Sequence, residues 1–266
     1  MKKFVVLIDF TSTSEIALHQ AIASAKGQGT SLVLLHVLGH FQEAKRNSVL
    51  SALEALATQA QAAGLSAKAE VLVGDLYSDV ADYVRDHAID MVFVGTHGSQ
   101  GLKQTLFGSN IYKLVKGLAA PALVVNDKCK VVEGGFKKIL LPVAPHEEFL
   151  VKVTQAQVLL AKEGSIVLFA IMKPGINLDE PTSRNLQKAK AYLDAHGVNY
   201  SYETVDATHF GLGYARETLE IVQNMDIDMI GILTRVSAEN QAFGRMDKEG
   251  MLLNDLGLPI LCSNQA

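Results

Sequence analysis

The fold of this chain is decided by residues 91–110, which read MVFVGTHGSQGLKQTLFGSN. Met91–Gly95 is short, apolar and rich in valine, as a strand buried on both faces must be. A loop punctuated by glycine follows it. Beyond the loop, apolar residues recur at the three-and-four spacing of one helix face, at Ile111, Leu114, Val115 and Leu118. A buried strand that leads through a loop into a helix is typical of a parallel α/β sheet.

The glycine loop is a candidate phosphate site. Backbone amides approach a phosphate closely where residues lack a Cβ, and four positions qualify: Gly95, Gly98, Gly101 and Gly108. Ser109 adds a hydroxyl donor and is predicted to begin the helix, whose start directs free N–H groups and partial positive charge at an anion. His97 and Lys103 are candidate charge partners. Glycines alone are equally compatible with a loop that only makes a turn.

Strand and helix patterns alternate through residues 1–126. Short runs of Val, Leu and Ile, which we expect to form strands buried on both faces, cover Phe4–Asp9, Ser31–Val37, Ala67–Val73, Met91–Gly95 and Ala122–Val125. Between them lie stretches with helix-face spacing, and Ser12 or Thr13 is expected to cap the first of these helices. The alternation predicts an α/β fold with a parallel, doubly wound sheet. Ligands bind such sheets beyond the carboxyl ends of the strands, where the strand order reverses.

The chain repeats itself once. Three segments recur in the same order: Lys2–Asp9 as Lys137–Ala144, Ala88–Val94 as Asp226–Ile232, and Leu118–Val125 as Leu256–Cys262. The offset drifts only from 135 residues at the first pair to 138 at the last, which indicates duplication. The join is expected within 126–135, where charges and paired glycines interrupt the apolar pattern. We therefore expect two tandem domains, over residues 1–128 and 136–266.

Composition narrows the class of protein. No run of about 18 apolar residues occurs, so we expect no membrane span and no membrane partner. The formal charge of −4 argues against nucleic-acid binding through bulk charge. The sequence has only two cysteines, which form no disulfide framework and fit a reducing compartment. These features favour a cytoplasmic location.

The spacing Gly95-x2-Gly98-x9-Gly108-Ser109 resembles the signature of the universal stress protein family. Val6–Ser14 is similar to the opening strand of that family and the turn after it, and Leu35–Val37 to its second strand. The resemblance covers Met1 to Asn126. It implies a five-stranded parallel sheet in the order 3-2-1-4-5, and it implies ATP or AMP as the ligand of members that keep the glycine loop.

The resemblance also implies roles for individual residues. Asp9 would contact the ribose or the adenine, and the backbone around Val37 would meet the adenine. Gly95, His97 and Gly98 would line the ribose and phosphates, and Gly108 with Ser109 would cradle the phosphates. Asn110 departs from the family, which commonly has a small aliphatic residue here. Its amide could bind phosphate or ligate Mg²⁺, but we favour a cap of the helix.

The second copy lacks the residues of this site. Ala144 stands where the first copy has Asp9, and Leu233 and Val236 stand where it has Gly95 and Gly98. A β-branched residue such as Val236 resists a left-handed backbone. We therefore expect one nucleotide per chain and a degenerate second domain that packs on the first as a pseudo-dimer.

Several other residues receive structural interpretations. His36 is expected to be a structural histidine, since nothing completes a metal set around it. Asp75 and Asp79 are expected to complement the start of a helix. Cys129 falls in the expected linker, where we expect exposure; we favour an inert thiol, with a redox role as the alternative.

The leading functional hypothesis is a stress-response sensor or regulator that binds ATP or AMP and an unknown protein partner. A homodimer of the tandem chain is a further arrangement that the resemblance allows. The alternative is a nucleotide-free interaction or scaffold module. An ATP-dependent enzyme would need catalytic residues, and no acid–base or nucleophile arrangement is evident, so at most slow ATP hydrolysis is expected.

Overall fold

The computed structural model of the chain describes residues 1–96, 108–172, 175, 177–206, 214–234 and 248–264. Five of the residues considered above lie outside these ranges: His97, Gly98, Gly101, Lys103 and Val236.

The strands fall into two sets that follow one another along the chain. The first half contains β1 (Lys3–Leu7), β2 (Ser31–Leu38), β3 (Ser66–Val73), β4 (Met91–Gly95) and β5 (Ala122–Val125). The second half contains β6 (Phe136–Pro142), β7 (Leu160–Met172), β8 (Asn199–Asp206), β9 (Met229–Leu233) and β10 (Ile260–Ser263). Within the described ranges they form one ten-stranded sheet, in the order β3-β2-β1-β4-β5-β10-β9-β6-β7-β8.

Each half of the sheet is parallel and repeats one topology. The pairs inside the first half are parallel, and so are those inside the second. Counted from its own first strand, each half has the order 3-2-1-4-5. The predicted α/β class and doubly wound topology are confirmed.

The two halves join through β5 and β10, which pair antiparallel with Leu261 opposite Leu123. The predicted pseudo-dimer is thus one continuous sheet. Because the strands of each half are parallel and the joining pair is antiparallel, the carboxyl ends of the two halves lie at opposite edges of the sheet. Residues 126–135 connect β5 to β6.

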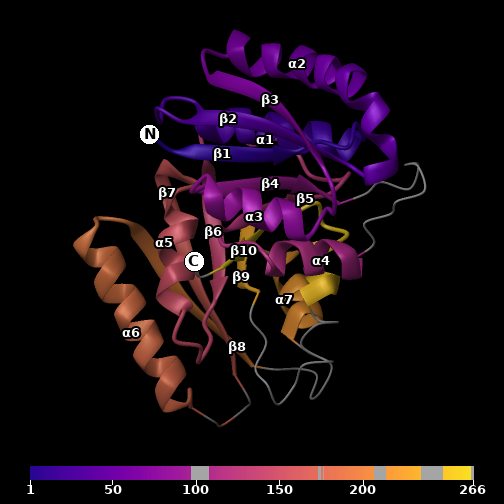
Figure 1. Cartoon of the computed structure of the whole chain (residues 1–266). Coiled ribbons are helices and arrows are strands. Elements are labelled where there is room, and N and C mark those ends of the chain that lie inside the picture. The colour runs from indigo at the N-terminus through magenta and orange to yellow at the C-terminus, as the bar shows by residue number, and fades with distance from the viewer. Residues whose placement is uncertain (97–107, 173–174, 176, 207–213, 235–247, 265–266) are drawn as a thin grey trace.

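Helices cover both faces of the sheet (Figure 1). The side chains of α1 (Ser12–Ala25), α2 (Arg46–Ala62), α5 (Phe149–Gln157) and α6 (Glu180–Ala195) pack on one face. Those of α3 (Ser78–Asp86), α4 (Gly108–Lys116) and α7 (Tyr214–Val222) pack on the other. A 3₁₀ helix, η1 (His40–Lys45), precedes α2. Figure 1 shows α2 beside β3 at one end of the sheet and α6 beside β8 at the other.

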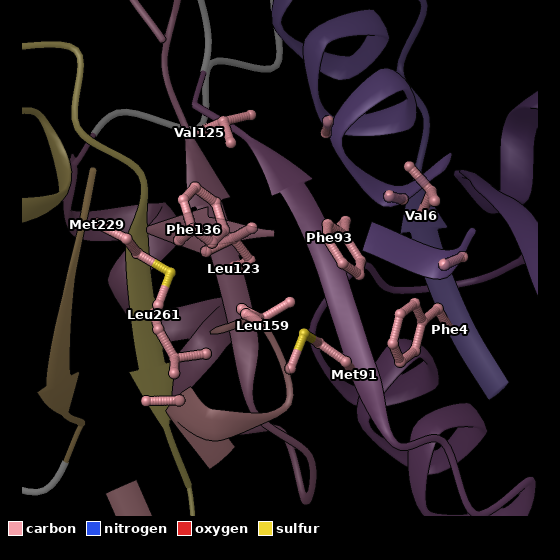
Figure 2. Close-up of a cluster of buried hydrophobic side chains, with 14 of the residues drawn as sticks. Phe4, Val6, Met91, Phe93, Leu123, Val125, Phe136, Leu159, Met229 and Leu261 are labelled. Carbon is pink, nitrogen blue, oxygen red and sulfur yellow. The ribbon is translucent and has the colours of Figure 1, made fainter. Parts of the chain in front are cut away.

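The hydrophobic core is continuous across the junction of the halves. Phe4 and Phe93 pack with ring centroids 5.3 Å apart, and the same cluster continues through Leu123 to Leu261 and Met229 (Figure 2). Each such side chain contributes about 1.5–3 kcal/mol when fully buried. The halves therefore share one core layer on this face.

Two predictions about burial are wrong. The segment Ala67–Val73 was expected to be buried on both faces, but β3 is an edge strand with mostly half-buried side chains. Cys129 was expected to be exposed, but it is buried, and burial raises the pKa of its thiol to about 11. The linker folds back on the core, which a sequence pattern of charges and glycines does not reveal.

Candidate functional site

The turn between β1 and α1 is organised by Asp9. Its Oδ1 accepts hydrogen bonds from the backbone N of Thr11 at 3.0 Å and from Thr11 Oγ1 at 2.6 Å. Thr11 Oγ1 in turn accepts from the backbone N of Ser14 at 3.3 Å, so Thr11 is the N-cap of α1. The prediction of Ser12 or Thr13 as the cap is wrong, because Asp9 fixes the turn one residue earlier. Phe10 completes it with φ of +63°, in the left-handed region.

The carboxyl end of β2 lies beside this turn. Leu7 pairs with Leu35 at the end of the β1–β2 ladder, and Leu35 O still accepts from the backbone N of Ile8 at 2.9 Å. Backbone groups two residues apart on a strand point to the same side. The half-buried Val37 therefore turns its N–H and C=O toward the space beyond the end of β1, at the level of Asp9.

His36 stabilises the same corner. Its Nδ1 lies 2.6 Å from Ile8 O, and its ring lies 5.3 Å from that of Phe10. These contacts hold the end of β1 against β2. The structural interpretation of His36 is confirmed.

Gly95 ends β4 directly beneath α1. A Cβ on Gly95 would lie 2.6 Å from both the carbonyl C and the O of Thr13, and 2.9 Å from the backbone N of Ser14. Only a residue without a side chain allows the first turn of α1 to approach the strand this closely. Gly95 therefore has a packing role, in addition to any contact with a ligand.

The strand order reverses between β1 and β4. They are neighbours, with Leu7 opposite Val94, yet α1 and α4, which follow them in the chain, lie on opposite faces of the sheet. The loops that leave the two strands diverge and open a crevice at such a point. The structure thus brings the sequence-predicted Asp9, Val37 and Gly95 to one edge.

α4 begins at Gly108, with Ser109 in its first turn. The helix packs on the sheet through Ile111, Leu114 and Val115, all of them fully or nearly fully buried. Asn110 is half-buried and is the third residue of α4. That places it inside the helix and not at the N-cap position that we favoured. His97 and Gly98, the remaining predicted site residues, lie outside the described ranges.

The start of α3 adjoins α4. Asp75 Oδ1 accepts from the backbone N of Tyr77 and of Ser78, at 2.9 Å each, and these bonds lower the pKa of its carboxyl group. Asp79 Oδ2 accepts from the backbone N of Asp75 at 2.6 Å. The interpretation of both residues as helix-start groups is confirmed. Lys113 of α4 lies over the Tyr77 ring at 4.0 Å and links the two helices.

The equivalent edge of the second half is built differently. The buried Leu233 ends β9, where Gly95 ends β4. The O of Ala144, the residue that replaces Asp9, accepts from Asn185 Nδ2 at 2.8 Å. The buried Lys152 of α5 donates from Nζ to Pro142 O, and desolvation with the nearby Lys248 lowers its pKa to about 7. The sequence pattern gave no signal for Lys152, which sits at an ordinary helix position.

Other features of the described residues point away from this edge. A cavity lined by Ser24, Lys26 and Glu133 lies at the far end of α1 from Asp9. Among the described residues, no group of three or more His, Cys, Asp or Glu is placed to hold a metal ion. No described helix has the length and apolar character needed to cross a membrane.

Comparison with known proteins shows what the first half of the chain resembles. Residues 1–126 match the profile described as "Universal stress protein family". A universal stress protein of Methanocaldococcus jannaschii is 25% identical over 156 residues, which cover 48% of this chain and 96% of that protein. The universal stress protein YxiE of Bacillus subtilis is 27% identical over 145 residues, covering 47% of this chain and 98% of its own.

The fold is shared over the whole length. A solved universal stress protein from Archaeoglobus fulgidus covers 99% of this chain and 96% of its own, with a TM-score of 0.75 and 13% identity. The sequence match thus lies in the first half, and the fold match extends through the second. The sequence of residues 1–126 is thus similar to the universal stress protein family, and the whole chain shares the fold of a solved member.

Proposed function

We propose that the first half binds one adenine nucleotide, ATP or AMP, in the crevice between β1 and β4, and that the protein acts as a stress-response sensor or regulator. The observation that carries the proposal is the convergence of Asp9, Val37 and Gly95 at the point where the strand order reverses. Ligands of doubly wound sheets bind at such points.

Each part of a nucleotide has a proposed partner. The carboxylate of Asp9 and the backbone of Val37 would hold the ribose and adenine. The start of α4, at Gly108 and Ser109, would face the phosphates with its N–H groups. His97 and Gly98 complete the proposed set. A Mg²⁺ ion would be held mainly by the phosphates, with Asn110 as a proposed amide ligand.

The two halves have different proposed roles. We place a nucleotide-binding domain in residues 1–128 and a degenerate domain in residues 136–266. Ala144 and the bulky Leu233 replace Asp9 and Gly95 in the second half, which supports a single nucleotide per chain. Binding would alter a surface that a protein partner recognises. We propose the cytoplasm as the location and leave open a homodimer of the tandem chain.

A nucleotide-free interaction module is the second candidate, and Gly95 favours it. The close approach of Thr13 accounts for this glycine without any phosphate. Mass spectrometry of gently desalted protein, with thermal melting in the presence of ATP, separates the two candidates. Retained nucleotide or a raised melting temperature supports the nucleotide site. If neither effect is observed at millimolar ATP, the nucleotide-free module is supported.

Asp9→Asn is expected to weaken ATP binding about tenfold with little loss of stability. An asparagine oxygen can still accept the two hydrogen bonds from Thr11, so the turn into α1 survives. The variant loses the charge, and a charged hydrogen bond is worth about 1.5–3 kcal/mol. Isothermal titration calorimetry measures the affinity, and urea denaturation measures the stability.

Asp9→Ala is the matched comparison, since it removes both the hydrogen bonds that hold the turn and the negative charge. We expect it to lose about 1 kcal/mol of stability as well as ATP affinity. Asp9→Asn with wild-type ATP affinity would show that Asp9 serves the turn alone.

A further inference from the structure

The second half holds α4 in place through hydrogen bonds. The start of this helix would face the phosphates. Tyr112, in the middle of α4, donates from Oη to the backbone O of Thr234 at 2.7 Å. Thr234 directly follows β9 in the second half. Tyr112 is 3% exposed and Thr234 is 5% exposed, so loss of this bond would leave a buried carbonyl without its donor.

Asn264 holds the other end of the same helix. From its position after β10, it donates from Nδ2 to Val115 O at 2.8 Å and to Ala120 O at 2.9 Å. Its Oδ1 accepts from Thr234 Oγ1, so the two residues of the second half are bonded to each other. Gln155 of α5 also holds Asn264, because its Nε2 donates to Asn264 O at 2.7 Å. One network therefore holds α4 at Tyr112 and at Val115.

The hydrogen bonds between the two halves are not symmetric. Asn126 occupies the position of Asn264 in the first half and donates from Nδ2 to Asn254 O at 2.8 Å, so the asparagine clamp is reciprocal. Gly250 occupies the position of Tyr112 in the second half, at the 138-residue offset, and has no side chain to donate. The tyrosine link is thus confined to the half that keeps the glycine signature.

We infer that the second half completes the nucleotide site of the first, with Tyr112, Thr234 and Asn264 as positioning residues for the phosphate-facing start of α4. The inference rests on the proposed nucleotide binding. α4 has nine residues and a length of about 13 Å, and Tyr112 lies one turn beyond Ser109. A helix held at Tyr112 and Val115 cannot slide or tilt without breaking buried hydrogen bonds. Its first N–H groups are thereby fixed before a phosphate arrives, which lowers the entropic cost of binding.

The test measures ATP and adenosine affinities of the full chain by calorimetry. Tyr112→Phe removes one hydroxyl and keeps the ring. Asn264→Ala removes the second attachment. Tyr192→Phe is the matched control, because Tyr192 Oη donates to Gln157 Oε1 at 2.8 Å between α6 and α5, away from α4. Amide hydrogen exchange of residues 108–116 without nucleotide measures independently how firmly these hydrogen bonds hold α4.

We expect Tyr112→Phe and Asn264→Ala to weaken ATP binding at least about fivefold and adenosine binding by less than about twofold. Tyr192→Phe should leave both affinities unchanged, and exchange in α4 should accelerate only in the first two variants. Equal loss of ATP and adenosine affinity, or wild-type ATP affinity in Tyr112→Phe, would overturn the inference while the proposed function stands. A wild-type chain that binds neither ligand would overturn both.

Discussion

Gly95→Ala is expected to lower the free energy of unfolding by on the order of 3 kcal/mol. The added Cβ would lie 2.6 Å from the carbonyl C and O of Thr13. Both are backbone atoms of the first turn of α1, which the bonds among Asp9, Thr11 and Ser14 hold in place. The strand or the helix must therefore shift. Urea denaturation at a fixed pH measures the loss.

Gly39→Ala is the matched control for Gly95→Ala. Gly39 follows β2 and has φ of −63°, and no atom of the described residues lies within 4 Å of its Cβ position. Alanine there should change stability by less than about 0.5 kcal/mol. Equal stability of the two variants would show that Gly95 is not required for packing. In that case a ligand contact would be the remaining reason for a glycine at this position.

Lys152→Met is expected to remove a pH dependence of stability between about pH 7 and 10.5. Burial and the charge of Lys248 lower the pKa of Lys152 from its ordinary 10.5 to about 7 in the folded chain. In this window the unfolded chain binds a proton that the folded chain does not. The free energy of unfolding therefore rises with pH by about 1.4 kcal/mol per pH unit, or up to about 5 kcal/mol in total. Below pH 7 that stability is absent.

Methionine matches the apolar stem of Lys152 without the ammonium group. The variant should therefore be more stable than the wild type at pH 7, and the two should converge near pH 10.5. Denaturation midpoints across this range measure the effect. Lys162→Met, at an exposed position in β7, is the control and should keep the wild-type slope. Parallel profiles of stability against pH for Lys152→Met and the wild type would refute the lowered pKa of Lys152.

The fold was largely predictable because its signals are local and repeated. Buried parallel strands must be continuously apolar, and Met91–Gly95 and Ala122–Val125 were predicted with the bounds that the structure has. The bounds of β3 were predicted to within one residue, but its burial was predicted wrongly, since a position at the edge of the sheet is a tertiary property. The duplication predicts that the two halves pack as a pseudo-dimer. It does not predict that β5 and β10 pair antiparallel and join the halves in one sheet.

The candidate site was predictable in part. Asp9 and Gly95 stand out because each was expected to end a strand. In the structure Asp9 is the second residue after β1, Gly95 ends β4, and the two lie at one edge. It also shows what spacing could not, that both have structural partners, Thr11 and Thr13. The paired Asn126 and Asn264 were a visible signal, since both follow the last strand of their half. Tyr112 gave none, because its partner is a backbone carbonyl 122 residues away.

The number of ATP molecules bound per chain tests the central claim most directly. Calorimetric titration of the wild type should give about one site, and Gly108→Val, which adds a β-branched side chain at the start of α4, should give none. Thermal melting of the variant checks that it remains folded. Two sites per wild-type chain would contradict the assignment of a degenerate second half. Wild-type binding by Gly108→Val would contradict the placement of the phosphates at α4.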